Sequence, residues 1–106
     1  MLFELRQYRT HPGKREQWVE MMENEIIPFQ VSQGMSIVGS FTGEEEDDLY
    51  VWIRRFESEE QRVALYEAVY QSDTWLNDIS PRIPELLDRE SIKVTRLNPT
   101  SVSALH

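Results

Sequence analysis

Residues 49–56 read LYVWIRRF, and this stretch decides the fold. β-Branched and aromatic side chains dominate it, as is typical of a β-strand. Successive side chains of a strand point to opposite faces of its sheet. One face would carry Leu49, Val51 and Ile53, and the other would carry Tyr50, Trp52 and Phe56. The sequence therefore predicts a central strand that is apolar on both faces.

Weaker strand patterns and two helical patterns surround this strand. The other predicted strands are residues 2–10, 35–42 and 91–97. Helical spacing of apolar residues begins at Lys14, and Pro28 is expected to kink or end that helix. A second helix is expected after Ser58, which forms a capping box with Gln61.

The segment before the last strand is less regular. Residues 72–75, SDTW, predict a fresh helix cap followed by a short helix. Pro81 and Pro84 are expected to break the chain beyond it, and Leu86 and Leu87 would form one more apolar turn.

The element order is therefore β-α-β-β-α-β, with an extra short helix before the last strand. This is the ferredoxin-like α+β pattern, in which two helices pack on one face of a four-stranded antiparallel sheet. A chain of 106 residues has the length of one domain. We assign residues 1–98 to that domain and residues 99–106 to a C-terminal tail, which is expected to be loose or docked on a partner.

Two helices can cover only one face of this sheet. The central strand nevertheless carries apolar side chains on both faces, whereas a face in contact with water is normally polar. Exposed apolar patches usually mark an interface. We therefore expect an isologous homodimer in which two copies pack sheet against sheet.

Composition excludes several classes of function. Nineteen acidic and eleven basic residues give a formal net charge of −8, so the chain repels phosphate backbones and nucleic acid is not an expected partner. There is no cysteine, which excludes disulfides, thiolate nucleophiles and iron–sulfur ligation. The longest uncharged stretch, residues 26–43, is interrupted by proline and glycine, so no membrane span is predicted and the expected location is the cytoplasm.

No metal or cofactor site is predicted. Residues 44–48, EEEDD, lack the alternating spacing and central glycine of a calcium loop and are interpreted as a solvated hairpin loop. His11 lies at a strand-to-helix junction, where it is expected to cap or to face water, and His106 is the last residue. Neither histidine is placed as an axial haem ligand would be.

One set of side chains is a candidate ligand site. It consists of Arg6, Tyr8, Tyr50, Trp52 and Arg54, which share one sheet face if the first and third strands are neighbours. A guanidinium beside aromatic rings suits a flat ligand that is anionic or bears a carbonyl. The alternative is that these residues form the dimer core, with Arg6 pairing with Glu4 or with a partner's carboxylate. Trp18, Met22, Tyr66 and Trp75 have helical core spacing and are expected to be core, or otherwise the wall of a pocket.

Several short motifs resemble the NIPSNAP family. The opening ELRQY at residues 4–8 is followed by PGK at 12–14. Val51-Trp52 is followed by FES at 56–58 and by Arg62, and SDTW follows at 72–75. Their order and spacing match the family over roughly residues 2–97.

This resemblance implies a dimeric α+β barrel, in which two ferredoxin-like sheets face each other with their helices outside. The superfamily includes cofactor-free monooxygenases, haem-degrading enzymes and isomerases, while NIPSNAP members mostly lack a defined enzymatic activity. We expect a small, partly apolar ligand between sheet and helices. One alternative is a cofactor-independent monooxygenase or isomerase, in which Trp52, Tyr8 and Arg54 hold an enolate-like form of an aromatic or polyketide-like substrate. The other is a structural or interaction subunit with no pocket. Shared folds do not choose among these functions.

Overall fold

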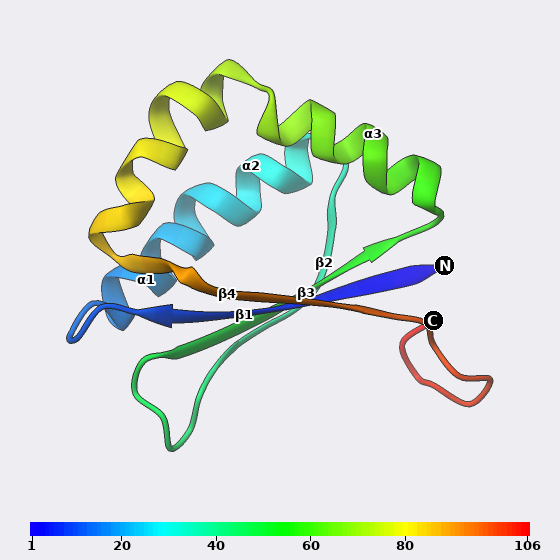
Figure 1. The fold of residues 1–106 in the computed structure, drawn as a ribbon. Helices are drawn as coiled ribbons and strands as arrows, with labels where there is room; N and C mark the ends of the chain where they lie inside the picture. The colour runs from blue at the N-terminus through cyan, green and yellow to red at the C-terminus, as the bar shows by residue number, and fades with distance from the viewer.

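The computed structural model describes residues 1–106 as one sheet covered on one side by helices (Figure 1). The strands are β1 (Leu2–Thr10), β2 (Ser36–Thr42), β3 (Leu49–Phe56) and β4 (Leu87–Leu97). The helical segments are α1 (Arg15–Met21), η1 (Met22–Ile26), α2 (Ile27–Ser32), α3 (Glu59–Tyr70), η2 (Thr74–Ile79) and η3 (Ser80–Glu85). The sheet has the order β2-β3-β1-β4 and all neighbours are antiparallel, which confirms the ferredoxin-like α+β prediction.

The register between β1 and β3 decides which side chains meet. Arg6 lies opposite Trp52, and Tyr8 lies opposite Tyr50. Because partners in an antiparallel pair point to the same face, the even-numbered residues of both strands face the helices. The odd-numbered residues face the other side of the sheet, which we call the open face.

The first helical region runs without interruption to Ser32, so Pro28 does not end it. A proline ring collides with the carbonyl four residues earlier in a regular α-helix. Here a wider π turn, η1, directly precedes the proline, and the Ile27 amide bonds the carbonyl of Met22, five residues back. The wider turn accommodates Pro28 at the start of α2.

The second helical region begins as the sequence predicts. Ser58 Oγ accepts a hydrogen bond from the Gln61 amide at 3.1 Å, and Gln61 Oε1 accepts one from the Glu57 amide at 2.6 Å. Beyond α3 the chain continues through the π turn η2 and the 3₁₀ turn η3, so Pro81 and Pro84 lie within a helical segment.

The prediction of an apolar turn at Leu86 and Leu87 holds for Leu86, which caps the C-terminal end of η3, but is wrong for Leu87. Leu87 is the first residue of β4 and pairs with Thr10, so the strand starts four residues before the expected Ser91. Residues 88–90, DRE, are polar and have no strand-like pattern. Backbone pairing with β1, after a bulge between Gln7 and Arg9, extends the strand through them.

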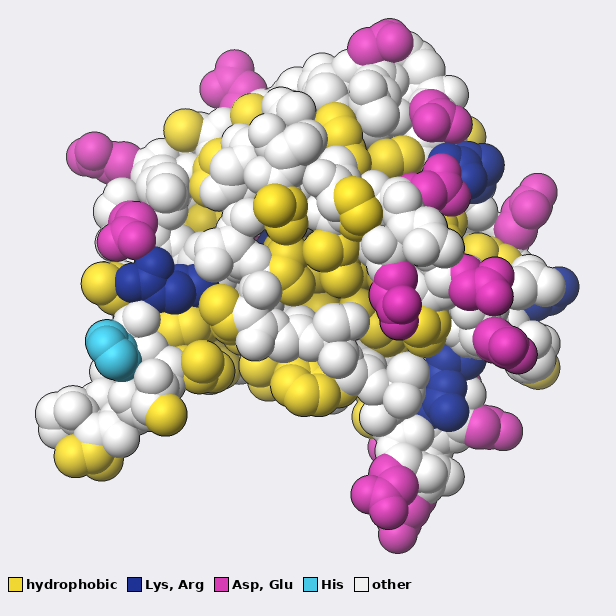
Figure 2. All heavy atoms as spheres, turned by 180° about the vertical axis from the view of Figure 1, so that it is seen from behind, with side chains coloured by type: hydrophobic (Ala, Val, Ile, Leu, Met, Phe, Trp, Pro, Cys, Tyr) yellow, Lys and Arg dark blue, Asp and Glu magenta, His cyan; other side chains and the backbone are white.

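The open face carries apolar side chains such as Leu5, Val51 and Ile53 together with polar ones such as Gln7, and it is only partly covered. The tail turns back onto its own sheet, where Arg55 Nε donates a hydrogen bond to the His106 carbonyl at 2.7 Å and Leu105 lies near Phe3 and Ile53. The tail and the acidic β2–β3 loop both project away from the helices (Figure 1). Figure 2 shows hydrophobic side chains exposed along the lower side of the molecule between these two projections. None of the helices is long and apolar enough to cross a bilayer.

Candidate functional site

A cavity of about 60 Å³ lies between the sheet and the helices. Its aromatic wall is made by Tyr8, Trp18, Trp52, Tyr70 and Trp75. Its aliphatic wall is made by Met22, Ile26, Ile83, Leu87 and Ile92. The two remaining lining residues are Arg6 and Arg89, and no aspartate, glutamate or histidine lines the cavity.

The predicted site residues divide between the cavity and its surroundings. Arg6, Tyr8 and Trp52 line the cavity, whereas Tyr50 and Arg54 share their sheet face without lining it. Tyr50 is buried beside Tyr8, with 6.3 Å between ring centroids, and its hydroxyl lies 2.6 Å from Ser40 Oγ. All five lie under the helices, away from the open face that a facing sheet would cover.

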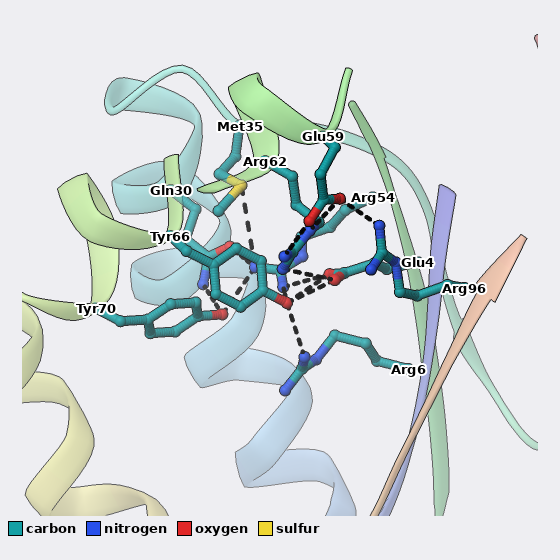
Figure 3. Close-up of polar contacts among 10 residues, drawn as sticks. All are labelled: Glu4, Arg6, Gln30, Met35, Arg54, Glu59, Arg62, Tyr66, Tyr70 and Arg96. Atoms are coloured by element: carbon teal, nitrogen blue, oxygen red, sulfur yellow. Dashed lines mark hydrogen bonds and ion pairs between the residues drawn. The ribbon is translucent and has the colours of Figure 1, made fainter. Parts of the chain in front are cut away.

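Arg54 is the centre of a buried polar network (Figure 3). Its side chain is 0% exposed, and Nη2 forms an ion pair with Glu4 Oε1 at 2.8 Å. Nη2 also donates to Tyr66 Oη at 2.9 Å, and Nη1 donates to Tyr70 Oη at 2.7 Å and to Gln30 Oε1 at 2.9 Å. Both Nη atoms are therefore engaged with protein groups from β1, α2 and α3, whereas the buried Nε has no partner.

Glu4 is satisfied by the same network. Tyr66 Oη donates to this carboxylate, 2.7 Å from both oxygens, and Arg62 Nη1 approaches it at 3.9 Å. Burial raises the pKa of both Tyr66 and Tyr50 to about 12, so these phenols keep their protons at neutral pH.

Arg6 differs from Arg54 because it has no carboxylate partner. Its Nε donates to Tyr8 Oη at 2.7 Å, and Nη1 has a long contact of 3.4 Å to Tyr66 Oη. The Tyr66 hydroxyl stands between Arg6 and Glu4, and Glu4 pairs with Arg54 instead. Arg6 therefore does not form the pair with Glu4 that the dimer-core alternative expected.

Sequence reasoning missed several residues of this region. Glu4 was considered only as a partner of Arg6, although it lies opposite Arg54 once β1 and β3 are paired. Gln30 and Arg89 carried no signal: the first is a polar residue buried on α2, and the second lies in the polar start of β4.

The other candidates have structural contacts. His11 Nε2 lies 2.9 Å from the Pro84 carbonyl, which ties the β1–α1 turn to η3. In the acidic loop, Glu46 and Asp48 form ion pairs with Arg9 at 3.0 and 2.9 Å. No three acidic or histidine side chains are grouped closely enough to hold a metal ion.

The outer edge of the network provides a pH-dependent prediction. Hydrogen bonds from Arg62, at 2.7 and 2.9 Å, hold the pKa of Glu59 at about 2, against an ordinary value of 4.5. A carboxyl whose folded pKa is lowered contributes stability that is present above its unfolded pKa and is lost as pH falls through the folded value.

The melting temperature of Glu59→Gln should therefore be lower than that of the native protein above pH 4.5, and the difference should shrink as the pH approaches 2. Glu60→Gln is the matched control, since Glu60 lies on the same helical turn as Glu59 but forms no ion pair. A difference that stays constant from pH 6 to pH 2 would contradict the assignment.

The fold and the cavity together define a class: a ferredoxin-like α+β domain with a small aromatic cavity between sheet and helices. The family model for NIPSNAP matches residues 3–103, and the chain belongs to the NIPSNAP family. No curated protein matches the chain.

Several solved structures of similar fold are NIPSNAP proteins. Atu4242 from Agrobacterium tumefaciens is a NIPSNAP family protein with unknown function; it is 26% identical over 100% of both chains, with a TM-score of 0.89. Atu5224 from the same organism is 23% identical over 99% of this chain and 98% of that one, with a TM-score of 0.86. An uncharacterized NIPSNAP domain protein from Burkholderia xenovorans is 22% identical over 97% and 98%, with a TM-score of 0.84.

Proposed function

We propose that this NIPSNAP protein binds a small, partly apolar molecule in the cavity between sheet and helices. The observation that carries the proposal is the cavity of about 60 Å³, walled mainly by aromatic and aliphatic side chains around Arg6. Ligand sites are typically apolar concavities with a few polar groups that fix orientation. A structural subunit with a fully packed interior would not need such a space.

The cavity supports binding better than the enzymatic alternative. Ligand pockets for drug-sized molecules have volumes of about 300–1,000 Å³, so this cavity suits a much smaller molecule than a polyketide. Its wall has no carboxylate or histidine to act as a general base, and burial raises the pKa of the Tyr8 phenol. The network also occupies Arg54, which the enzymatic alternative assigned to an enolate.

The binding proposal is tested through the tryptophan indole signals in ¹⁵N–¹H spectra. All three tryptophans line the cavity, so a small bound molecule should move their indole N–H signals. A panel of molecules with three to six heavy atoms serves as the probe. Ile83→Phe should reduce the shifts by filling the cavity, and Val63→Phe, on the outer side of α3, should not. The proposal fails if no member of the panel moves an indole signal.

We also propose that two copies associate through their open faces. Phe41 is 54% exposed there, beside the partly exposed Val51 and Ile53 of β3. Apolar patches of this kind are costly on a monomer. Two projections flank this face (Figure 2).

The dimer leads to a prediction with a matched control. Sedimentation of the native protein at micromolar concentration should give about twice 12.6 kDa. Phe41→Glu should shift the mass toward the monomer, because it places a charge on the open face. Val63→Glu adds the same charge at a side chain that is 52% exposed on α3, and the dimer should survive it. A native monomer, or equal effects of the two variants, would contradict sheet-to-sheet association.

A further inference from the structure

We propose that the ligand is an anion, a short-chain monocarboxylate, and that Arg6 binds its carboxylate group. The inference rests on the proposed function, because it names the chemistry of the molecule that the cavity takes. It is carried by two features of the cavity wall: an arginine without a counter-ion, and several hydrogen-bond donors without acceptors.

The charge around the cavity is unbalanced. Arg6 is partly buried and is the inner of the two arginines that line the space, yet it takes part in none of the ion pairs of the structure. The nearest buried carboxylate, Glu4, is neutralised by Arg54. Taking an ion out of water is costly unless an opposite charge compensates it. A ligand carboxylate would supply the missing negative charge.

The cavity wall also has more hydrogen-bond donors than acceptors. Tyr8 Oη accepts a bond from Arg6, and Tyr70 Oη accepts bonds from Arg54 and Gln30, but neither hydroxyl proton has an acceptor. The buried indole Nε1 atoms of Trp18 and Trp52 also have no partner. Buried donors without acceptors cost free energy, and such exceptions point to an absent partner. The missing partner must supply acceptor oxygens.

A carboxylate fits these features better than a phosphate. The planar guanidinium matches two carboxylate oxygens in a bidentate pair. A phosphate carries more charge, and of the two arginines that line the cavity without an ion pair only Arg6 lies in its inner part, since Arg89 is exposed and bonds Ser80. A volume of about 60 Å³ is several times the roughly 10–15 Å³ needed to hold one water molecule but far below that of pockets for drug-sized ligands, which limits the ligand to a carboxylate with a short apolar chain.

The test compares carboxylates with neutral molecules of the same shape. Acetate, propionate and butyrate are titrated at constant ionic strength, with the corresponding amides alongside, and the tryptophan indole signals report binding. Each carboxylate should bind at least tenfold more tightly than its amide. In Arg6→Gln this preference should disappear, so that each carboxylate binds no more tightly than its amide.

Two controls separate the local effect of Arg6 from other causes. Arg9→Gln removes the same charge from β1 outside the cavity, where Arg9 pairs with Glu46 and Asp48, and it should keep the carboxylate preference. Arg6→Met keeps the apolar stem and should stay folded without ligand, because removal of an unpaired charge offsets the lost hydrogen bond to Tyr8. Arg6 would have a structural role if both Arg6 variants unfolded, and the proposal would be overturned.

The outcomes distinguish this inference from the proposed function. If amides bind as tightly as carboxylates and Arg6→Gln binds both equally, the cavity is a ligand site but the anion proposal is wrong. If Arg9→Gln loses the preference as fully as Arg6→Gln, the effect comes from net charge and the proposal is again overturned. If neither series binds, while other small molecules in the panel do, the carboxylate assignment alone fails.

Discussion

Replacing Arg54 with methionine should destabilise the fold by about 3–5 kcal/mol, the usual cost of removing one partner from a buried ion pair. The guanidinium is 0% exposed and the whole of Glu4 is 1% exposed, so the remaining carboxylate would stay in the interior without its cation. Tyr66 would still donate to Glu4, but Tyr70 and Gln30 would lose their shared donor.

Denaturant unfolding with linear extrapolation measures this loss. Arg55→Met is the matched control, because Arg55 is the next residue of β3, points to the open face, and pairs with the exposed Glu57. Exposed pairs contribute about 0–1 kcal/mol, so this variant should stay close to the native protein. Glu4→Leu added to Arg54→Met should recover part of the loss, because an apolar replacement removes the stranded charge. Equal stabilities for the Arg54 and Arg55 variants would show that the buried network does not hold the fold.

The parts of the fold that the sequence predicts correctly depend on local signals. The alternation of residues 49–56 identifies β3 and both of its faces, and Ser58 with Gln61 marks the start of α3. The start of β4 carries no such signal, because Asp88 joins the strand only through pairing with Arg9 on β1. The passage of the first helix through Pro28 depends on a π turn, for which the spacing of apolar residues gives no sign.

The candidate site shows the same division. Arg6, Tyr8 and Trp52 could be grouped in advance, because alternation and the expected neighbouring strands place them on one face. The sequence could not predict that Arg54 lies outside the cavity that these residues line. That outcome depends on which arginine pairs with the single buried carboxylate, Glu4. That choice is set by strand register and by α3, which brings Tyr66 between Arg6 and Glu4. The unpaired state of Arg6 is therefore a property of the tertiary structure alone.

Replacing Trp52 with alanine should have a comparably large effect, a loss of about 3–5 kcal/mol, as is usual for truncating a buried aromatic residue. Trp52 is 2% exposed, and its ring packs edge-on against Tyr8 with 6.3 Å between centroids. The Arg54 guanidinium lies 4.9 Å from the centre of the Trp52 ring, so this cation–π contact would also be lost. Because Trp52 already lines the cavity, its removal should join the vacated space to the existing volume.

The enlarged cavity gives this prediction a second measurement, since apolar cavities of sufficient size bind small aromatic molecules. Indole added at millimolar concentration should raise the melting temperature of Trp52→Ala and leave that of the native protein nearly unchanged. Trp52→Phe is the control: it keeps a ring in the same place, so it should lose only about 1–3 kcal/mol and gain little from indole. If Trp52→Ala were no less stable than Trp52→Phe, and indole stabilised both variants equally, Trp52 would not be a packed wall of the cavity.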